Sequence, residues 1–277
     1  MKDHIQNLID LALAEDIGVG DITTTAIIDP KARGIGMIAS QQPLVLAGMD
    51  VAKRVFQTVE PGISWDARRQ DGTRCENGDI IATVEGSARG LLAAERTALN
   101  FLQKLSGVAT LTNLFAHAVR DKNVKILDTR KTTPGFRALE KYAVRMGGGT
   151  NHRMGLYDHF LVKSNHVDSA GSLSAALERA MKARQPGQLV WIEARNVKEV
   201  KEALDGGADI ILLDNMSVND VRDAVRTVRG RTKVEVSGNI NLESLISYAA
   251  TGIDYISVGT ITHSAPAVDI HMTLKIE

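Results

Sequence analysis

Residues 206–215 read GGADIILLDN, and residues 250–259 read ATGIDYISVG. Each segment runs from a glycine-containing turn into a short apolar stretch and ends on a polar residue or a glycine. Two segments so alike are typical of successive strand–helix units, in which a buried strand follows the turn after a helix. This repeat predicts a parallel α/β arrangement for the second half of the chain.

Six short apolar runs follow one another from residue 125 onward. Helical patterns separate most of them, at 173–183, 197–204, 218–228 and 242–250. Short, nearly continuous apolar strands that alternate with helices indicate a parallel sheet covered on its outer side. Because a closed barrel needs eight such units, six predict an open, incomplete parallel α/β barrel. The predicted strands are Lys125–Leu127, Phe160–Val162, Leu189–Ile192, Ile210–Leu213, Lys233–Val236 and Tyr255–Val258.

The first part of the chain has a mixed α+β pattern. Helical periodicity predicts helices over 5–14 and 49–59, and two helices within 88–120 that hinge at Ser106-Gly107. The glycine-punctuated GVGDITTTAI is expected to be a loop. The alternating segment 268–276 is expected to form a strand that returns to the first domain. Further short strands are predicted at Ile35–Ser40, Pro43–Leu46, Ile63–Arg68 and Asp79–Val84.

Composition narrows the function. The 33 basic residues balance 33 acidic ones, so the chain has no general attraction for nucleic acid or anionic membranes, and a basic cluster must act locally. The single cysteine, Cys75, excludes an internal disulfide and suits a reducing cytoplasm. The N-terminus lacks a signal-peptide core, and no apolar stretch is long enough to span a membrane. We therefore expect a cytoplasmic protein.

Polar residues or glycine turns follow every predicted strand: DTRK, KSNH, EAR, DN, SGN and GTITHS. In parallel α/β barrels the carboxyl ends of the strands converge on one mouth, where the chemistry takes place. Each motif has an ordinary alternative by itself, such as a solvated basic loop or a helix cap. Six together favour a shared active-site pocket.

The charged residues at these ends fall into two classes. Arg130, Lys131, Arg153 and Lys163 can bind anions, and the arginine fork matches a carboxylate or phosphate. Two carboxylates, Glu193 and Asp214, suit Mg²⁺, which completes its shell with water and substrate phosphate. Their alternative role is ion pairing with the nearby cations.

The last two strands end in glycine turns, Ser237-Gly238-Asn239 and Gly259-Thr260. Barrels commonly hold a phosphate in backbone N–H groups at these positions, although a plain tight turn is the alternative. Two other features of the sequence do not predict a binding site. The histidines at 152, 159 and 166 lack the carboxylate or cysteine that would complete a zinc site, and the glycines at 147–149 lack the setting of a dinucleotide fingerprint. No organic cofactor is predicted.

The segment DTRKTTPGFRALEKYAVRMGGGTNHRMGLYDHFLVKSNH (128–166) closely resembles the core of the quinolinate phosphoribosyltransferase family, decarboxylating enzymes of NAD biosynthesis. GDITT and ERTALNFLQKLSG upstream, and LDN, EVSGN, ISVG and THS downstream, extend the resemblance over nearly the whole chain. It implies an N-terminal α/β sandwich-like domain (1–106, with the C-terminal strand 266–277) and a seven-stranded open α/β barrel (107–265).

The resemblance also implies roles for individual residues. Lys131, Lys163, Glu193 and Asp214 would be catalytic, and the two acids would hold Mg²⁺ bound with phosphoribosyl pyrophosphate (PRPP). Arg96 would come from a neighbouring subunit of a homodimer or hexamer. The residues that would bind quinolinate are Arg96, Thr129, Arg130, His152, Arg153 and Lys163. The residues that would bind PRPP and its phosphates are Lys131, Glu193, Asp214, Ser237, Gly238, Asn239, Val258, Gly259, Thr260 and His263.

Two residues depart from the family pattern. Asn239 stands where many relatives have glycine, and because asparagine tolerates a positive φ we expect the turn to survive. Trp191 stands where the family often has a second acid, on the same strand face as Glu193. This substitution is expected to alter metal or ribose contacts.

The implied reaction is a pentosyl transfer: quinolinate and PRPP give nicotinate mononucleotide, CO₂ and pyrophosphate. Three alternatives stay open. A molybdenum-transport-associated paralogue shares the fold, but that group lacks the intact Asn-His-Arg and the lysine at the second strand end. A Schiff-base aldolase would use Lys163 as its nucleophile. A sugar-phosphate sensor would bind ligand without turnover.

Overall fold

The computed structural model describes residues 2–277 and divides the chain into two compact units. The first contains the residues up to Asn113 together with Thr133–Gly148 and Ser264–Glu277, and the second contains Leu114–Thr132 and Gly149–His263. The predicted domain boundaries after residues 106 and 265 stay a prediction, because units defined by contacts need not coincide with domains.

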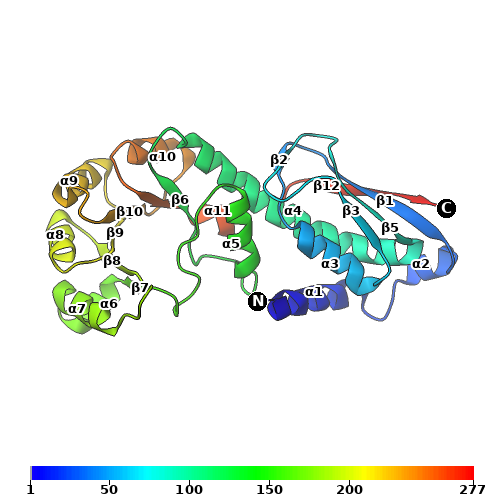
Figure 1. Cartoon of the computed structure of the whole chain (residues 1–277), viewed down its shortest axis with the longest axis horizontal. Helices are drawn as coiled ribbons and strands as arrows, with labels where there is room; N and C mark the ends of the chain where they lie inside the picture. Colours follow the sequence, from blue (N-terminus) through cyan, green and yellow to red (C-terminus); the bar gives the residue numbers. More distant parts are fainter. Residues whose placement is uncertain (1) are drawn as a thin grey trace. The chain divides into compact units, whose positions relative to one another are not determined.

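An antiparallel sheet in the order β12-β1-β5-β3 forms the centre of the first unit (Figure 1). Residues of β1 alternate between buried and more exposed positions, so one face of the sheet supports a core. The long helix α4 and the amphipathic α3 supply apolar side chains to this core, and Phe56 of α3 contacts the Trp65 ring of β3 at 5.8 Å. The strands are β1 (Arg33–Ser40), β3 (Ser64–Ala67), β5 (Ile80–Ser87) and β12 (Ile270–Ile276).

The C-terminal strand β12 pairs with β1, as the alternating pattern of 268–276 suggests. A small second sheet joins two strands, one of which, β4, was not predicted. Helix α3 has the predicted bounds, and α1 is longer than predicted. The remaining elements of this unit are α1 (Lys2–Ile17), α2 (Ile22–Ile27), β2 (Leu44–Val45), α3 (Met49–Val59), β4 (Arg74–Cys75), α4 (Ala88–Ala118) and α5 (Arg137–Met146).

Two predictions for this unit are wrong. Helix α4 is one continuous helix of 31 residues without a hinge. Its small residues serve packing: the Ser106 hydroxyl accepts the Ala47 amide at 3.0 Å, and a Cβ at Gly107 would overlap the carbonyl of Pro266. The segment GVGDITTTAI contains helix α2, because the side chain of Asp21 accepts the Thr24 amide at 2.9 Å and caps its N-terminus.

The second unit contains a six-stranded parallel sheet in the order β6-β11-β10-β9-β8-β7, and all six predicted strands are present (Figure 1). No pairing within the described residues joins β6 to β7, so the barrel is open and the predicted fold class is confirmed. The strands are β6 (Lys125–Leu127), β7 (Phe160–Val162), β8 (Val190–Ala194), β9 (Ile210–Asp214), β10 (Lys233–Ser237) and β11 (Tyr255–Ser257).

The seventh strand implied by the family resemblance is not formed within residues 2–277. Thr150 makes only an isolated parallel bridge to Leu127, next to β6. The residues that follow cannot continue a ladder because side chains take their backbone amides. The amide of His152 donates to Asp128 at 2.8 Å, and the amide of Gly155 donates to Asp158 at 3.0 Å.

Helices cover the outer side of this sheet, which explains why its strands are apolar on both faces. Side-chain oxygens of Asn196, Ser217 and Asn241 cap α8, α9 and α10, so each returning helix starts at a defined residue. These helices are α6 (Ser164–Ala170), α7 (Leu173–Ala183), α8 (Val197–Asp205), α9 (Val218–Val228), α10 (Leu242–Ala249) and α11 (Thr260–His263). None of the helices in residues 2–277 combines the length and apolarity needed to cross a bilayer.

Candidate active site

A pocket of about 640 Å³ lies at the carboxyl ends of the parallel strands, and all of its lining residues belong to the second unit. Most of the predicted site residues line it, so the strand ends meet in one place as the sequence predicts; the role of each residue stays a prediction. The predicted residues in the lining are Thr129, Arg130, Lys131, His152, Arg153, Lys163, Asp214, Ser237, Gly238, Asn239, Gly259, Thr260 and His263.

Three predicted residues do not line this pocket. The Glu193 side chain is largely buried beside it and lies 3.9 Å from the ammonium of Lys163. Val258 is buried, and its amide donates to the Leu127 carbonyl at 2.9 Å, so it joins β11 to β6. Arg96 is an exposed residue of α4 in the first unit.

Asp128, at the end of β6, organises the segment that carries His152 and Arg153. It is fully buried and accepts the His152 amide at 2.8 Å and the Asn151 side-chain amide at 2.6 Å. A buried carboxylate with two such donors is a structural anchor. The aspartate of the DTRK motif therefore positions the Asn-His-Arg segment.

The guanidinium of Arg153 is the most deeply buried cation of the pocket. Its Nη1 donates to the His159 carbonyl at 3.2 Å, while its Nε has no hydrogen-bond partner among the described residues. Burial and the positive charge of Arg130 both lower the pKa of Arg153. Two neighbouring cations, one with an unpaired buried donor, form a site for an anion.

The two candidate metal ligands come from neighbouring strands, Glu193 from β8 and Asp214 from β9. Burial raises the pKa of Glu193, the charge of Lys163 opposes this shift, and the negative charge of Asp214 adds to it. Two neighbouring carboxylates supply oxygen ligands of the kind that a divalent cation such as Mg²⁺ takes.

Two consecutive residues with positive φ form the turn after β10. Gly238 has a φ of 108° and Asn239 a φ of 48°, so the prediction that asparagine preserves this turn is confirmed. A Cβ at residue 238 would overlap the side chain of Asn215, which follows β9. Only glycine fits between these two loops.

The turn after β11 lies against the DTRK segment. The Thr262 hydroxyl donates to the Lys131 carbonyl at 2.7 Å, and a Cβ at Gly259 would lie 3.2 Å from the Lys131 side chain. The absence of a side chain at residue 259 thus brings the lysine next to the second glycine turn. A cation and a backbone turn converge there, as binding of a phosphorylated ligand requires.

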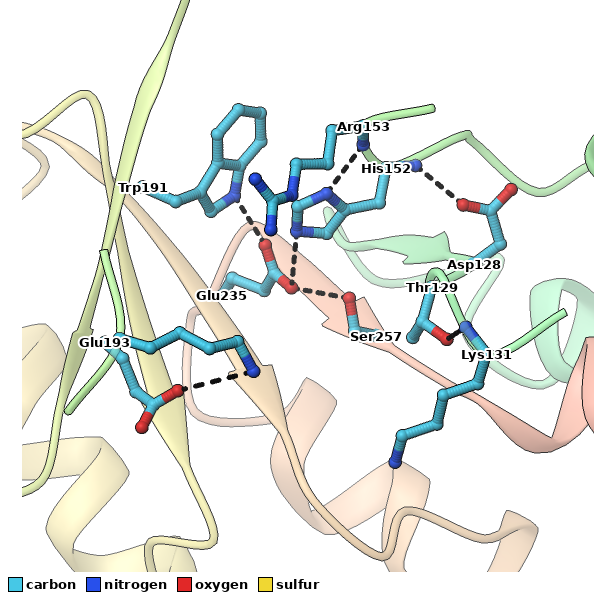
Figure 2. A network of polar contacts seen from close by, with 10 residues as sticks. Asp128, Thr129, Lys131, His152, Arg153, Trp191, Glu193, Glu235 and Ser257 are labelled. Carbon is cyan, nitrogen blue, oxygen red and sulfur yellow. Dashed lines mark hydrogen bonds and ion pairs between the residues drawn. The ribbon is translucent and has the colours of Figure 1, made fainter. Parts of the chain in front are cut away.

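Sequence reasoning missed a polar network on the pocket floor (Figure 2). Glu235 of β10 lines the pocket and accepts hydrogen bonds from Trp191 Nε1 at 2.8 Å and from the Ser257 hydroxyl at 2.5 Å. His152 Nε2 lies 3.7 Å from Glu235 Oε1. The signal for this network was an acid in the middle of an apolar strand, KVEVS.

Comparison with known proteins identifies the family. A family model described as quinolinate phosphoribosyl transferase, N-terminal domain, matches residues 21–106, and its C-terminal counterpart matches residues 108–273. A nicotinate-nucleotide pyrophosphorylase (carboxylating) from Mycobacterium leprae is 43% identical, with 98% of each chain covered. A probable nicotinate-nucleotide pyrophosphorylase (carboxylating) from Bacillus subtilis is 38% identical over 99% of this chain and 95% of the relative.

Solved structures agree. The crystal structure of NadC from Streptococcus pyogenes matches with a TM-score of 0.96 and 38% identity, covering 100% of this chain and 98% of that one. The nicotinate-nucleotide pyrophosphorylase from Francisella tularensis matches with a TM-score of 0.96 and 40% identity, covering 99% and 97%. From both family models and from relatives that match along the whole length, it follows that this chain belongs to the quinolinate phosphoribosyl transferase family.

Proposed function

We infer that this protein transfers the phosphoribosyl group of PRPP to quinolinate with decarboxylation, giving nicotinate mononucleotide, CO₂ and pyrophosphate in NAD biosynthesis. Relatives that match nearly the whole of this chain carry names for this reaction. The observation that carries the inference is the buried Nε of Arg153, which has no partner within residues 2–277 and lies in a pocket that Arg130 also lines. A ligand with two carboxylates satisfies this arrangement.

We assign quinolinate binding to the cationic residues of the pocket. Arg153 and Arg130 each offer a planar donor fork, and Lys163 adds an ammonium from the end of β7. Thr129 and His152 complete the proposed contacts. Holding the ring by both carboxylates orients its nitrogen for in-line attack on the sugar. This positioning lowers the activation free energy of the transfer.

We assign PRPP to the ends of the inner strands β8, β9, β10 and β11, together with Lys131 after β6. Backbone amides of the turns after β10 and β11 would hold its 5′-phosphate, and Lys131 would neutralise its pyrophosphate. Glu193 and Asp214 would hold Mg²⁺, which supplies positive charge to the pyrophosphate oxygens when bound. The residues proposed for the 5′-phosphate are Ser237, Gly238, Asn239, Val258, Gly259, Thr260 and His263.

The chemistry follows from these placements. The ring nitrogen attacks C1 of the ribose while the bond from C1 to pyrophosphate breaks, and Lys131 stabilises the departing oxygen. The carboxylates of Glu193 and Asp214 offset positive charge that grows on the ribose. The nitrogen is then quaternary, so the C2 carboxylate can leave as CO₂ and its electron pair stays next to N⁺. No covalent enzyme intermediate is needed.

A second copy of the chain is part of this proposal. Arg96 is exposed on α4, and we propose that it completes the quinolinate site of a partner in a homodimer or hexamer. At a quinolinate concentration below the wild-type KM, Arg96→Ala and Arg153→Ala proteins should each have little activity, while a refolded mixture should recover about a quarter of wild-type activity, because half of the dimers carry one intact site. Mixed dimers without recovered activity would refute the shared site. The proposed setting is the cytoplasm.

The direct test supplies quinolinate, PRPP and Mg²⁺ and measures pyrophosphate and nicotinate mononucleotide. Equimolar formation supports the proposal, and no product refutes it. The aldolase alternative needs a desolvated or cation-flanked lysine, but Lys163 is half-exposed and lies 3.9 Å from Glu193. Borohydride trapping of Lys163 with a carbonyl substrate would nevertheless establish that alternative.

A further inference from the structure

Glu235 is a buried acid for which the proposed reaction has so far no use. Its side chain is only 1% exposed, although it lines the pocket from the middle of β10. Trp191 Nε1 donates to Oε2, and the Ser257 hydroxyl donates to Oε1. These donors come from β8 and β11, so three strands fix the carboxyl group. Such burial costs stability, and a functional role offers a reason to keep it.

His152 is the neighbour that this carboxyl group orients. Its Nδ1 accepts the Arg153 amide at 2.6 Å, which leaves the ring hydrogen on Nε2. Nε2 lies 3.7 Å from Glu235 Oε1, so its ring hydrogen is next to the carboxyl group. The imidazole also stacks on Trp191, with ring centroids 4.8 Å apart (Figure 2). Tautomer and ring orientation are therefore both determined.

The surroundings favour storage of a proton at this pair. Burial raises the pKa of Glu235 to about 7, while the hydrogen bonds from Ser257 and Trp191 oppose the shift. The other charged or titratable groups that line the pocket are Arg130, Lys131, Arg153, Lys163, Asp214 and His263. When a ligand with carboxylates and phosphates enters, its negative charge favours one more proton on the pair, and this proton lies on Glu235 because both ring nitrogens of His152 are already engaged.

We propose that Glu235 and His152 act as a proton-storing pair, which takes up one proton when the anionic substrates bind and returns it to the ring carbon that has lost CO₂. The proposal rests on the proposed function. The bond from C2 to its carboxylate breaks, CO₂ leaves, and the electron pair remains on C2. That electron pair takes the proton from Nε2 of His152 and a C2–H bond forms, while the proton stored on Glu235 passes to Nε2, so the pair of residues returns to its initial charge. Glu235 is the positioning residue and His152 the donor.

The other cations of the pocket are less suited to this step. Arginine does not release a proton at neutral pH, which excludes Arg130 and Arg153. Lys163 is paired with Glu193, and Lys131 lies against the glycine turn after β11. Among the described lining residues, the Glu235–His152 pair combines deep burial with a proton that is exchangeable near neutral pH.

The test separates the two chemical steps in Glu235→Gln, which keeps the size of the side chain but cannot store the proton. In a single turnover with quinolinate, PRPP and Mg²⁺, rapid quenching measures pyrophosphate and nicotinate mononucleotide. We expect pyrophosphate to form at a rate near that of the wild type. Nicotinate mononucleotide should lag by at least about tenfold, because an unprotonated carbanion recaptures CO₂.

The experiment distinguishes failure of the proton-storing role from failure of the proposed function. If Glu235→Gln slows both products equally, or slows neither, the proton-storing role is overturned. If the wild type releases no pyrophosphate from these substrates, the proposed function itself fails. Ser257→Ala provides an independent test that keeps the carboxyl group. Loss of its hydrogen bond raises the pKa of Glu235, so the pH profile of nicotinate mononucleotide formation should move to higher pH. An unmoved profile would contradict the proposal, even if Glu235→Gln did not fold.

Discussion

The ammonium of Lys163 lies 3.9 Å from the carboxylate of Glu193, across the ends of the adjacent strands β7 and β8. This pair joins a residue proposed for quinolinate to one proposed for PRPP and its metal. In the proposed assignment the quinolinate and PRPP sites adjoin at this ion pair, and changing either residue should affect the chemical step as well as binding.

Glu193→Gln is expected to lower kcat about 10²- to 10³-fold, since it removes a charge aimed at the developing oxocarbenium ion. Steady-state kinetics at saturating substrates measure this. The control is Glu202→Gln on α8, which breaks a pair of the same length with Lys198 away from the pocket. An unchanged kcat in Glu193→Gln would remove this residue from the mechanism.

Arg153→Ala should weaken quinolinate binding by about 1.5–3 kcal/mol, roughly 10- to 150-fold, because a charge-assisted hydrogen bond is lost. Arg153→Lys should not restore affinity, since the ammonium cannot reproduce the planar fork. Arg226→Ala serves as the control, because Arg226 is an exposed arginine of α9 paired with Asp223. Titration of quinolinate measures all three, and wild-type affinity in Arg153→Ala would contradict the assignment.

Gly238→Ala should raise the KM for PRPP and lower stability by more than Gly187→Ala does. Both glycines have a positive φ, so both substitutions carry the same kind of backbone strain, about 1 kcal/mol. Only at Gly238 does the new methyl group overlap a neighbour, Asn215, whereas nothing lies within 4 Å at Gly187. Thermal unfolding and PRPP titration compare the two. Equal effects would show that the loop is not sterically fixed.

Gly107→Ala tests the packing of α4. Helix propensity alone predicts that alanine stabilises a helix interior by about 1 kcal/mol. The overlap with the Pro266 carbonyl predicts the opposite sign, a loss of about 1–3 kcal/mol. Denaturant unfolding decides between them, with Gly62→Ala as a control because open space surrounds Gly62. A more stable Gly107→Ala protein would contradict the packing role.

The raised pKa of Glu235 has a consequence for stability. An acid whose pKa is higher in the folded state, here about 7, binds more protons folded than unfolded, so stability is lost as pH rises through 7. Glu235→Gln removes this dependence. Its Tm relative to the wild type should therefore be higher at pH 8 than at pH 5. A Tm difference that stays constant between these values would show that Glu235 does not titrate in this range.

Much of the fold could be predicted because apolar periodicity is a direct consequence of burial. The six parallel strands, and the bounds of α3, α7 and α9, follow from it. Helix α2 and the continuous α4 could not be read in this way. A side-chain cap at Asp21 and a close backbone contact at Gly107 override the usual meaning of glycine. The contact at Gly107 depends on Pro266, which is distant in the sequence, whereas the cap at Asp21 is local but lies in a segment whose glycines are typical of a loop.

The candidate site likewise contains residues that could be predicted from the sequence and residues that could not. Strand ends such as Arg130 and Asp214 could be found because topology brings them together whatever their partners are. The role of Glu235 could not be predicted from the sequence, because it depends on hydrogen-bond donors from two other strands, β8 and β11. The expectation that Trp191 changes metal or ribose contacts stays a prediction; what the structure adds is its hydrogen bond to Glu235 and its contact with His152.

The most direct test of the central claim follows each quinolinate carboxylate separately. Quinolinate labelled in the 2-carboxylate or in the 3-carboxylate is incubated with the protein, PRPP and Mg²⁺, and labelled CO₂ and pyrophosphate are counted. We expect the 2-carboxylate label to leave as CO₂ in equal amount to pyrophosphate, only when PRPP is present, while the 3-carboxylate label stays in nicotinate mononucleotide. Retention of both labels, or CO₂ release without PRPP, would contradict the account.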